Sequence, residues 1–144
     1  MDRNYAIHSD RPKLQETNYI EIGTGRYSDK DWGKSSIFIN EDSFVVIEGI
    51  VKKHFKKYIR SEINHISRTK GRTIVDNLRE AAENVLGCTG NDILKVIDFH
   101  FDRSPKTINE FIKAKGSISK MLMGLADYME NAYENNDWIC MVVV

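Results

Sequence analysis

The sequence predicts a single α+β domain, in which about five helices pack around a small antiparallel sheet. Several stretches repeat apolar residues every three or four positions, as helices with one buried face do. Residues 36–39 and 138–144 are short, apolar and rich in residues that favour strands, so the sheet is expected to include both. The chain has 144 residues, 41% hydrophobic and 29% charged, which suits one globular unit over residues 1–144.

The first forty residues predict a polar arm followed by a hairpin. Residues 1–16 are polar with little periodicity and are expected to form a loosely held arm or an early loop. Residues 17–22 and 36–39 each predict a strand, and together they can form a hairpin. The intervening stretch contains G-T-G-R and G-K-S and is rich in turn residues, so an exposed loop is expected.

Two amphipathic helices are expected in the middle of the chain. The first begins after Asn40 as N-cap and runs to about Tyr58, with Glu48 placed four residues before Lys52 in the order that favours an ion pair. Gly49 inside it marks a close packing contact. Residues 61–71 are ambiguous and fit a short helix. The second helix begins near Thr73 and ends near Gly87. Its predicted inner face consists of Ile74, Val75, Leu78, Ala81, Ala82 and Val85.

The last third predicts further helices and a final strand. Residues 92–101 fit either a helix or a strand, whereas Ser104 followed by Pro105 is a strong helix start. Gly116 is expected to separate that helix from the next one, which begins at Ser117 and carries acidic residues as far as Asp137. Its core-facing arc contains Ile118, Met121, Leu122, Leu125, Met129, Ala132 and Tyr133. Residues 138–144 are almost wholly apolar, so we expect a strand covered on both faces.

Charge is distributed unevenly although the chain has 21 basic and 21 acidic residues. Residues 41–72 hold eight basic and four acidic residues, whereas residues 121–144 hold four acidic residues and no basic one. Such a layout bears on partners and on the steering of their approach, more than on the fold. The basic segment predicts either a solvated surface or a phosphate-binding face for nucleic acid, and no aromatic residues interleave the basic residues on the same helix face.

The acidic residues of the C-terminal helix form the strongest candidate site. Asp127, Glu130, Glu134 and Asp137 share one arc, with Met123 in its middle. Acids at this spacing often only keep a helix soluble. A methionine among carboxylates is also a plausible contact point in a protein interface, and fixed carboxylates can mimic nucleic-acid phosphates in a nuclease cleft. These five residues are therefore the predicted partner-binding site.

No catalytic or metal site is predicted. G-T-G-R and G-K-S lack the full phosphate-loop pattern. Asp98, His100 and Asp102 alternate in D-F-H-F-D and would share a face only on a strand, so a solvated segment is the simpler interpretation. Cys88 and Cys140 lie far apart without metal-ligand spacing, so two buried thiols are the simpler interpretation and a disulfide is the alternative.

One stretch resembles the immunity proteins of bacterial contact-dependent growth inhibition systems. It is G-K-S-S-I-F-I-N-E-D-S-F-V-V-I-E-G-I-V-K-K-H-F at 33–55, supported by the acidic C-terminal helix. The resemblance covers less than half of the chain and implies a small, cytoplasmic, cofactor-free protein. Such a protein neutralises one cognate toxin domain, frequently a nuclease, by tight binding.

The functional prediction is therefore an immunity protein without enzymatic activity. Its partner is a cognate toxin domain, with no membrane, no small-molecule substrate and no nucleic acid expected. No run of the sequence approaches the roughly 20 apolar residues that span a bilayer. The alternative is a nucleic-acid-binding or regulatory protein that uses the basic residues of 52–72.

Overall fold

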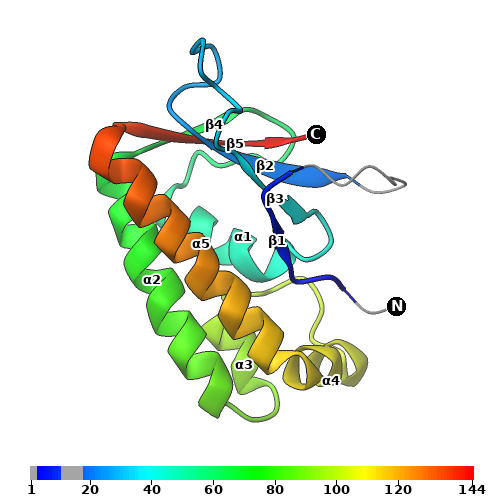
Figure 1. Ribbon diagram of the computed structural model, residues 1–144. Coiled ribbons are helices and arrows are strands. Elements are labelled where there is room, and N and C mark those ends of the chain that lie inside the picture. The colour runs from blue at the N-terminus through cyan, green and yellow to red at the C-terminus, as the bar shows by residue number, and fades with distance from the viewer. Residues whose placement is uncertain (1–2, 11–17) are drawn as a thin grey trace.

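The computed structural model describes residues 3–10 and 18–144. Within them the chain forms five helices and a five-stranded antiparallel sheet of order β1-β3-β2-β5-β4, which confirms the predicted α+β class (Figure 1). The strands are β1 (Ile7–His8), β2 (Tyr19–Thr24), β3 (Ile37–Asn40), β4 (Asn64–Ser67) and β5 (Trp138–Val143). The helices are α1 (Val45–His54), α2 (Arg68–Gly87), α3 (Asp92–Val96), α4 (Pro105–Lys113) and α5 (Lys115–Asn135).

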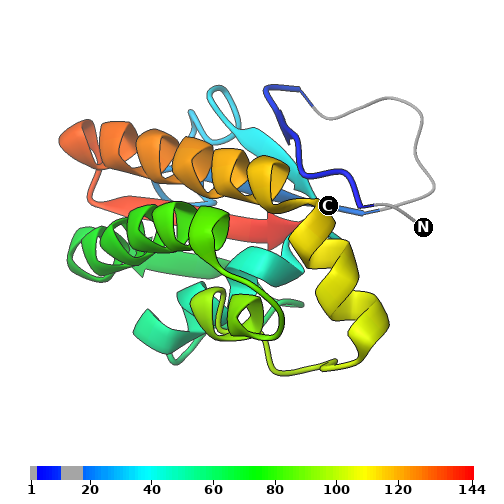
Figure 2. The ribbon, with the colours of Figure 1, turned by 90° about the horizontal axis from the view of Figure 1, so that it is seen from below.

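The molecule has two layers, because the helices lie together on one face of the sheet (Figure 1). Helices α2 and α5 run side by side beneath the strands (Figure 2). One sheet face points into the core, and Ile22 and Ile139 of the neighbouring strands β2 and β5 and Ile66 of the edge strand β4 are fully buried there. The other sheet face is partly covered by the loop between β2 and β3, whose Trp32 ring lies so close to Gly23 that no Cβ would fit there.

The predicted hairpin and the C-terminal strand are confirmed. β2 and β3 pair in antiparallel register with Ile20 opposite Ile39. β5 lies between β2 and β4, and its residues Ile139, Cys140 and Met141 are all buried, so both faces of its middle are covered. The prediction of a loosely held arm or an early loop over 1–16 is wrong at Ile7–His8, which pair with β3 as an edge strand; residues 1–2 and 11–16 lie outside the described part.

Four helix boundaries differ from the prediction. Asn40 starts a turn, because its side-chain oxygen accepts a hydrogen bond from the Asp42 amide, and α1 begins five residues later. Helix α1 also ends at His54, so Tyr58 reaches the core from a turn. Helix α2 begins earlier than Thr73, since the Ser67 hydroxyl accepts a hydrogen bond from the Lys70 amide. Gly116 lies inside the first turn of α5 and does not separate two helices.

The ambiguous residues 61–71 do not form a short helix of their own. Residues 64–67 form β4, where Asn64 and Ile66 are buried at the two-residue spacing of a strand, whereas Ile63 is exposed. The open interpretation of 92–101 resolves into a short helix, α3, followed by an irregular segment. Ser104 caps α4 as predicted, because its hydroxyl accepts a hydrogen bond from the Thr107 amide. The predicted inner face of α2 is buried throughout.

Candidate protein-interaction surface

Helix α5 is held rigidly by its buried side, and this fixes its exposed side. All seven predicted core residues of the helix are buried. The Tyr133 hydroxyl donates a hydrogen bond to the carbonyl of Ile66 in β4 at 2.9 Å. The Tyr128 hydroxyl lies 3.1 Å from the carbonyl of Ile22 and 2.9 Å from that of Ser35, and burial raises the pKa of this tyrosine to about 12. Both tyrosines therefore tie α5 to the sheet.

Two of the predicted acidic residues share one arginine. The Arg79 guanidinium, on α2, donates to Asp127 at 2.8 Å and to Glu130 at 2.5 Å. The two carboxyl side chains remain 61% and 59% exposed. The pair is therefore held in a fixed position on the surface, and Arg79 cancels part of its negative charge.

The other two predicted acidic residues lie farther along the same seam between α2 and α5. Glu134 lines a small pocket of about 330 Å³ together with Arg72 and Asp76 of α2. Asp137 lies beyond the end of α5, in the turn before β5, where Arg68 approaches it at 3.3 Å. The four carboxylates thus follow one seam. Asp137 was expected to lie on the helix, but it lies outside it.

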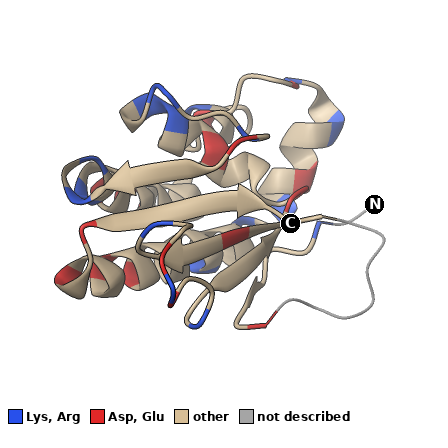
Figure 3. Cartoon of the chain, turned by 90° about the horizontal axis from the view of Figure 1, so that it is seen from above, with Lys and Arg blue, Asp and Glu red and all other residues tan. Residues whose placement is uncertain are grey.

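The expectation of an uncompensated acidic face needs correction. Residues 121–144 contain no basic residue, but α2 lies alongside and supplies Arg68 and Arg79 to three of the four carboxylates. Figure 3 shows the acidic residues of α5 next to the basic residues at the start of α2. The surface is therefore a mixed ion-pair seam with a surplus of carboxylates. That these residues bind a partner stays a prediction.

Met123 and Asp127 lie together on a groove beside this seam. The groove has a volume of about 980 Å³ and runs between α5 and the N-terminal segment 3–7. Met123 is half-buried and packs against the core, and Leu86 on the same groove is 55% exposed. Gly124 allows the N-terminal segment to approach, because a Cβ there would lie 2.8 Å from Ile7 Cδ1. An apolar groove with a charged rim has the anatomy of a protein interface.

The basic segment 52–72 is divided between two places: residues 52–60 lie on α1, which packs against α2, and on the loop after it, whereas Arg68, Lys70 and Arg72 belong to the start of α2, beside α5. Two of its arginines are used internally, since Arg60 pairs with Glu48 and Arg68 with Asp137. Its lysines Lys52, Lys53, Lys56 and Lys57 are exposed and form no ion pair with any residue of the described part.

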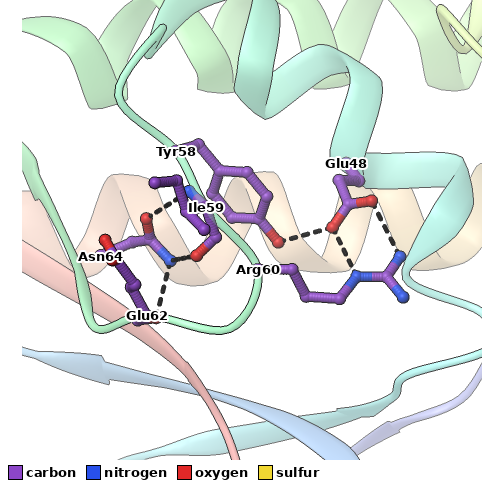
Figure 4. A network of polar contacts seen from close by, with 6 residues as sticks. All are labelled: Glu48, Tyr58, Ile59, Arg60, Glu62 and Asn64. Atoms are coloured by element: carbon purple, nitrogen blue, oxygen red, sulfur yellow. Dashed lines mark hydrogen bonds and ion pairs between the residues drawn. The ribbon is translucent and has the colours of Figure 1, made fainter.

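A buried polar network after α1 was not predicted. Glu48 is 5% exposed and accepts hydrogen bonds from the Tyr58 hydroxyl at 2.7 Å and from two nitrogens of Arg60 at 2.7 and 2.8 Å (Figure 4). The predicted Glu48–Lys52 pair is therefore replaced by a longer-range one. Burial and the neighbouring Glu48 raise the pKa of Tyr58. Nothing in a helical periodicity indicates this pairing, because the two partners belong to the turn beyond the helix.

The segment D-F-H-F-D does not assemble a metal site. His100 contacts Asp98 at 2.8 Å, whereas Asp102 accepts hydrogen bonds from Ser104 and Thr107 at the start of α4. Among residues 3–10 and 18–144, no group of three or more potential ligands is positioned to hold a metal ion.

The remaining candidate motifs have structural roles. G-T-G-R ends β2 and begins a turn in which the Arg26 amide donates to Asp29, and Lys34 of G-K-S pairs with Asp31. Both cysteines are free. Cys140 is buried as predicted, and burial raises its thiol pKa to about 12, whereas Cys88 is only half-buried.

Comparison of the chain with protein-family models, with curated proteins and with solved structures finds no match. The described helices also include none that combines the length and apolar character needed to cross a bilayer.

Proposed function

We propose that this chain is an immunity protein that neutralises a cognate toxin domain by binding it, without catalysing a reaction. The observation that carries the proposal is the position of Met123 and Asp127 on one groove, next to carboxylates that Arg79 holds in place. The resemblance of residues 33–55 to immunity proteins supports the same function, and with it a cytoplasmic location and a nuclease as the toxin.

The proposed mechanism is occlusion. The exposed carboxylates of Asp127, Glu130, Glu134 and Asp137 approach a basic, nucleic-acid-binding cleft of the toxin, where charge complementarity accelerates association. Met123 then enters an apolar recess at the centre of the contact, as central anchors of interfaces do. Because Arg79 fixes two of the carboxylates, less side-chain entropy is lost on binding than for free side chains. The toxin is left folded, with its substrate surface covered.

The test begins with the gene next to the one encoding this chain. If that neighbour encodes a secreted protein with a toxic C-terminal domain, the domain is expressed alone and its affinity for this chain is measured by calorimetry. We expect a dissociation constant in the nanomolar range or below and rescue of growth on co-expression. A toxic neighbour that neither binds nor is neutralised would contradict the proposed function.

The proposed surface is tested separately with conservative variants. Replacing the four acids together by Asn or Gln (Asp127→Asn, Glu130→Gln, Glu134→Gln, Asp137→Asn) is expected to weaken binding at least about a hundredfold, mainly through slower association. The matched control neutralises four exposed acids elsewhere, Asp10→Asn, Asp31→Asn, Asp42→Asn and Asp92→Asn, and changes the net charge equally. Equal effects of the two variants would remove the seam as the binding site while leaving the toxin-binding function intact.

A further inference from the structure

The last turn of α1 and the segment that joins it to β4 combine exposed lysines with exposed isoleucines. Ile59 and Ile63 are 48% and 47% exposed, and they are two of only five large apolar side chains exposed in the described part of the chain. Lys52, Lys53, Lys56 and Lys57 precede them in the sequence and are exposed without ion-pair partners among the described residues. We name residues 52–63 the basic turn.

The basic turn is held rigid from inside the protein (Figure 4). Asn64 is 4% exposed, and its side-chain amide donates to the carbonyls of Ile59 and Glu62 while its oxygen accepts from the Ile59 amide. Glu48 accepts hydrogen bonds from Tyr58 and Arg60, the residues immediately before and after Ile59. The backbone on both sides of Ile59 is thus fixed by buried groups, and the isoleucine itself remains at the surface. Such an arrangement lowers the ordering cost of binding.

We propose that the basic turn docks the protein on the surface of an anionic lipid bilayer. The four lysines supply positive charge that attracts anionic headgroups, and Glu62 offsets only one of them. Ile59 and Ile63 enter the boundary between headgroups and acyl chains, which is where apolar residues of peripheral proteins are buried. The sequence-based expectation of no membrane partner rested on the lack of a membrane-spanning run, and peripheral docking requires none.

The same surface fits nucleic acid less well. Single-stranded nucleic acid binds by stacking on aromatic side chains, but Tyr58 and Phe55, the aromatic residues of the basic turn, are buried. Arg60, which could hold a phosphate with two hydrogen bonds, is already bound to Glu48 in that manner. The lysine ammonium groups are compact point charges that do not distinguish the phosphates of nucleic acid from those of lipid headgroups, whereas the isoleucines have no counterpart on a phosphate backbone. Lysines flanking apolar side chains match a lipid surface.

Vesicle co-sedimentation tests the proposal. The full chain is mixed with phosphatidylcholine vesicles that either contain or lack phosphatidylserine, at low and at high salt. We expect binding only to the vesicles with phosphatidylserine, and weaker binding as salt rises. Replacing the four lysines by glutamine should weaken binding several hundredfold, at about fivefold for each lysine. The double variant Ile59→Ser/Ile63→Ser should weaken it about tenfold.

Two controls separate the basic turn from general charge and apolarity. The variant Lys30→Gln/Lys95→Gln/Lys106→Gln/Lys113→Gln changes the net charge by the same amount at exposed positions elsewhere, and Leu86→Ser/Phe101→Ser removes exposed apolar side chains elsewhere. Both should bind vesicles like the unmodified chain, with unchanged circular dichroism in all variants.

Three results would overturn the proposal. The first is no binding to phosphatidylserine vesicles at low salt. The second is equal loss of binding in the remote-lysine variant, or no loss in the isoleucine variant. The third is binding to a DNA or RNA oligonucleotide that the basic-turn variants abolish while the vesicles bind nothing, which would assign the surface to nucleic acid.

Discussion

Glu48 is a buried carboxylate, and its charge is stabilised by three hydrogen bonds from Tyr58 and Arg60. Burying such a charge is costly, and its partners offset the cost only while all of them are present. The Arg60 side chain is 34% exposed, so water shares in stabilising the guanidinium but reaches the carboxylate much less. The network therefore acts mainly to fix where the basic turn lies, and its contribution to net stability is secondary.

Removing a member of this network should destabilise the protein without unfolding it. We expect Tyr58→Phe to lower the free energy of unfolding by about 1 kcal/mol and Glu48→Gln by about 1–3 kcal/mol, because both leave a buried polar group with fewer partners. Chemical denaturation followed by circular dichroism measures both. Lys52→Gln is the control and should change stability by less than about 0.5 kcal/mol. A larger effect of Lys52→Gln would favour the helical Glu48–Lys52 pair instead.

Asp102 gives α4 a pH-dependent start. Hydrogen bonds from the Thr107 hydroxyl and from the Ser104 backbone amide lower its pKa below the usual 3.8. Because the folded pKa is depressed, the stabilisation is present above the usual value and is lost as the pH falls through the lower, folded one. Thermal melts of the unmodified chain and of Asp102→Asn should therefore differ above pH 3.8 and converge in more acidic solution. Parallel melting curves at all pH values would contradict this assignment.

At the scale of elements, the contact between α2 and α5 depends on a glycine. A Cβ at Gly71 would lie 2.2 Å from the Tyr133 ring, so the two helices can approach this closely only because that position has no side chain. The hydroxyl of the same tyrosine donates a hydrogen bond to the Ile66 carbonyl in β4. One glycine thus sets the distance between the two longest helices and, through Tyr133, their height below the sheet.

Gly71→Ala should therefore destabilise the protein by about 1–3 kcal/mol, because the rigid ring must move to admit a methyl group. Gly116→Ala in α5 is the matched control: nothing lies within 4 Å of the added Cβ, and alanine should raise stability slightly through its higher helix propensity. Urea denaturation of both variants measures the difference. If both alanines stabilised the protein equally, the close contact at Gly71 would be disproved.

The elements with many periodic residues could be predicted from sequence, whereas the short ones could not. The inner face of α2 follows from six apolar residues at helical spacing, and every one is buried. β4 has only four residues, and Ile63 just before it and Ile66 within it are three positions apart, which is also the spacing of a helix face. β1 has two residues and exists only because β3 offers it an edge. Whether such short segments form strands depends on their neighbours in the folded protein, and their own residues give little indication of those neighbours.

At the scale of the whole molecule, sequence segments overstate how far charges are separated. The acidic C-terminal segment packs against α2, and Arg68 and Arg79 of α2 form ion pairs with its carboxylates. The positions of Met123 and Asp127 on one side of α5 follow from helical spacing. Their groove does not, since its opposite wall is the N-terminal segment 3–7, more than a hundred residues away in sequence.

Arg79 offers a test of how charge acts at this surface. Arg79→Ala should cost less than about 1 kcal/mol of stability, since the pairs are largely exposed. If the proposed toxin partner is basic, the same variant should associate with it about two- to tenfold faster at low salt, because two carboxylates lose their compensating charge. Stopped-flow association rates measured across salt concentrations decide this. Slower association would show that Arg79 itself meets the partner.

The position of β5 in the sheet also dictates an order of folding. β5 is the last strand in the chain, and it alone connects β4 to the rest of the sheet, with Ile20 of β2 facing Val143 across 123 residues of sequence. Closing so long a loop is slow, and sheets that depend on it fold late. In refolding experiments with pulsed hydrogen exchange, amides of α2 and α5 should gain protection before those of β4, which has no neighbouring strand until β5 docks.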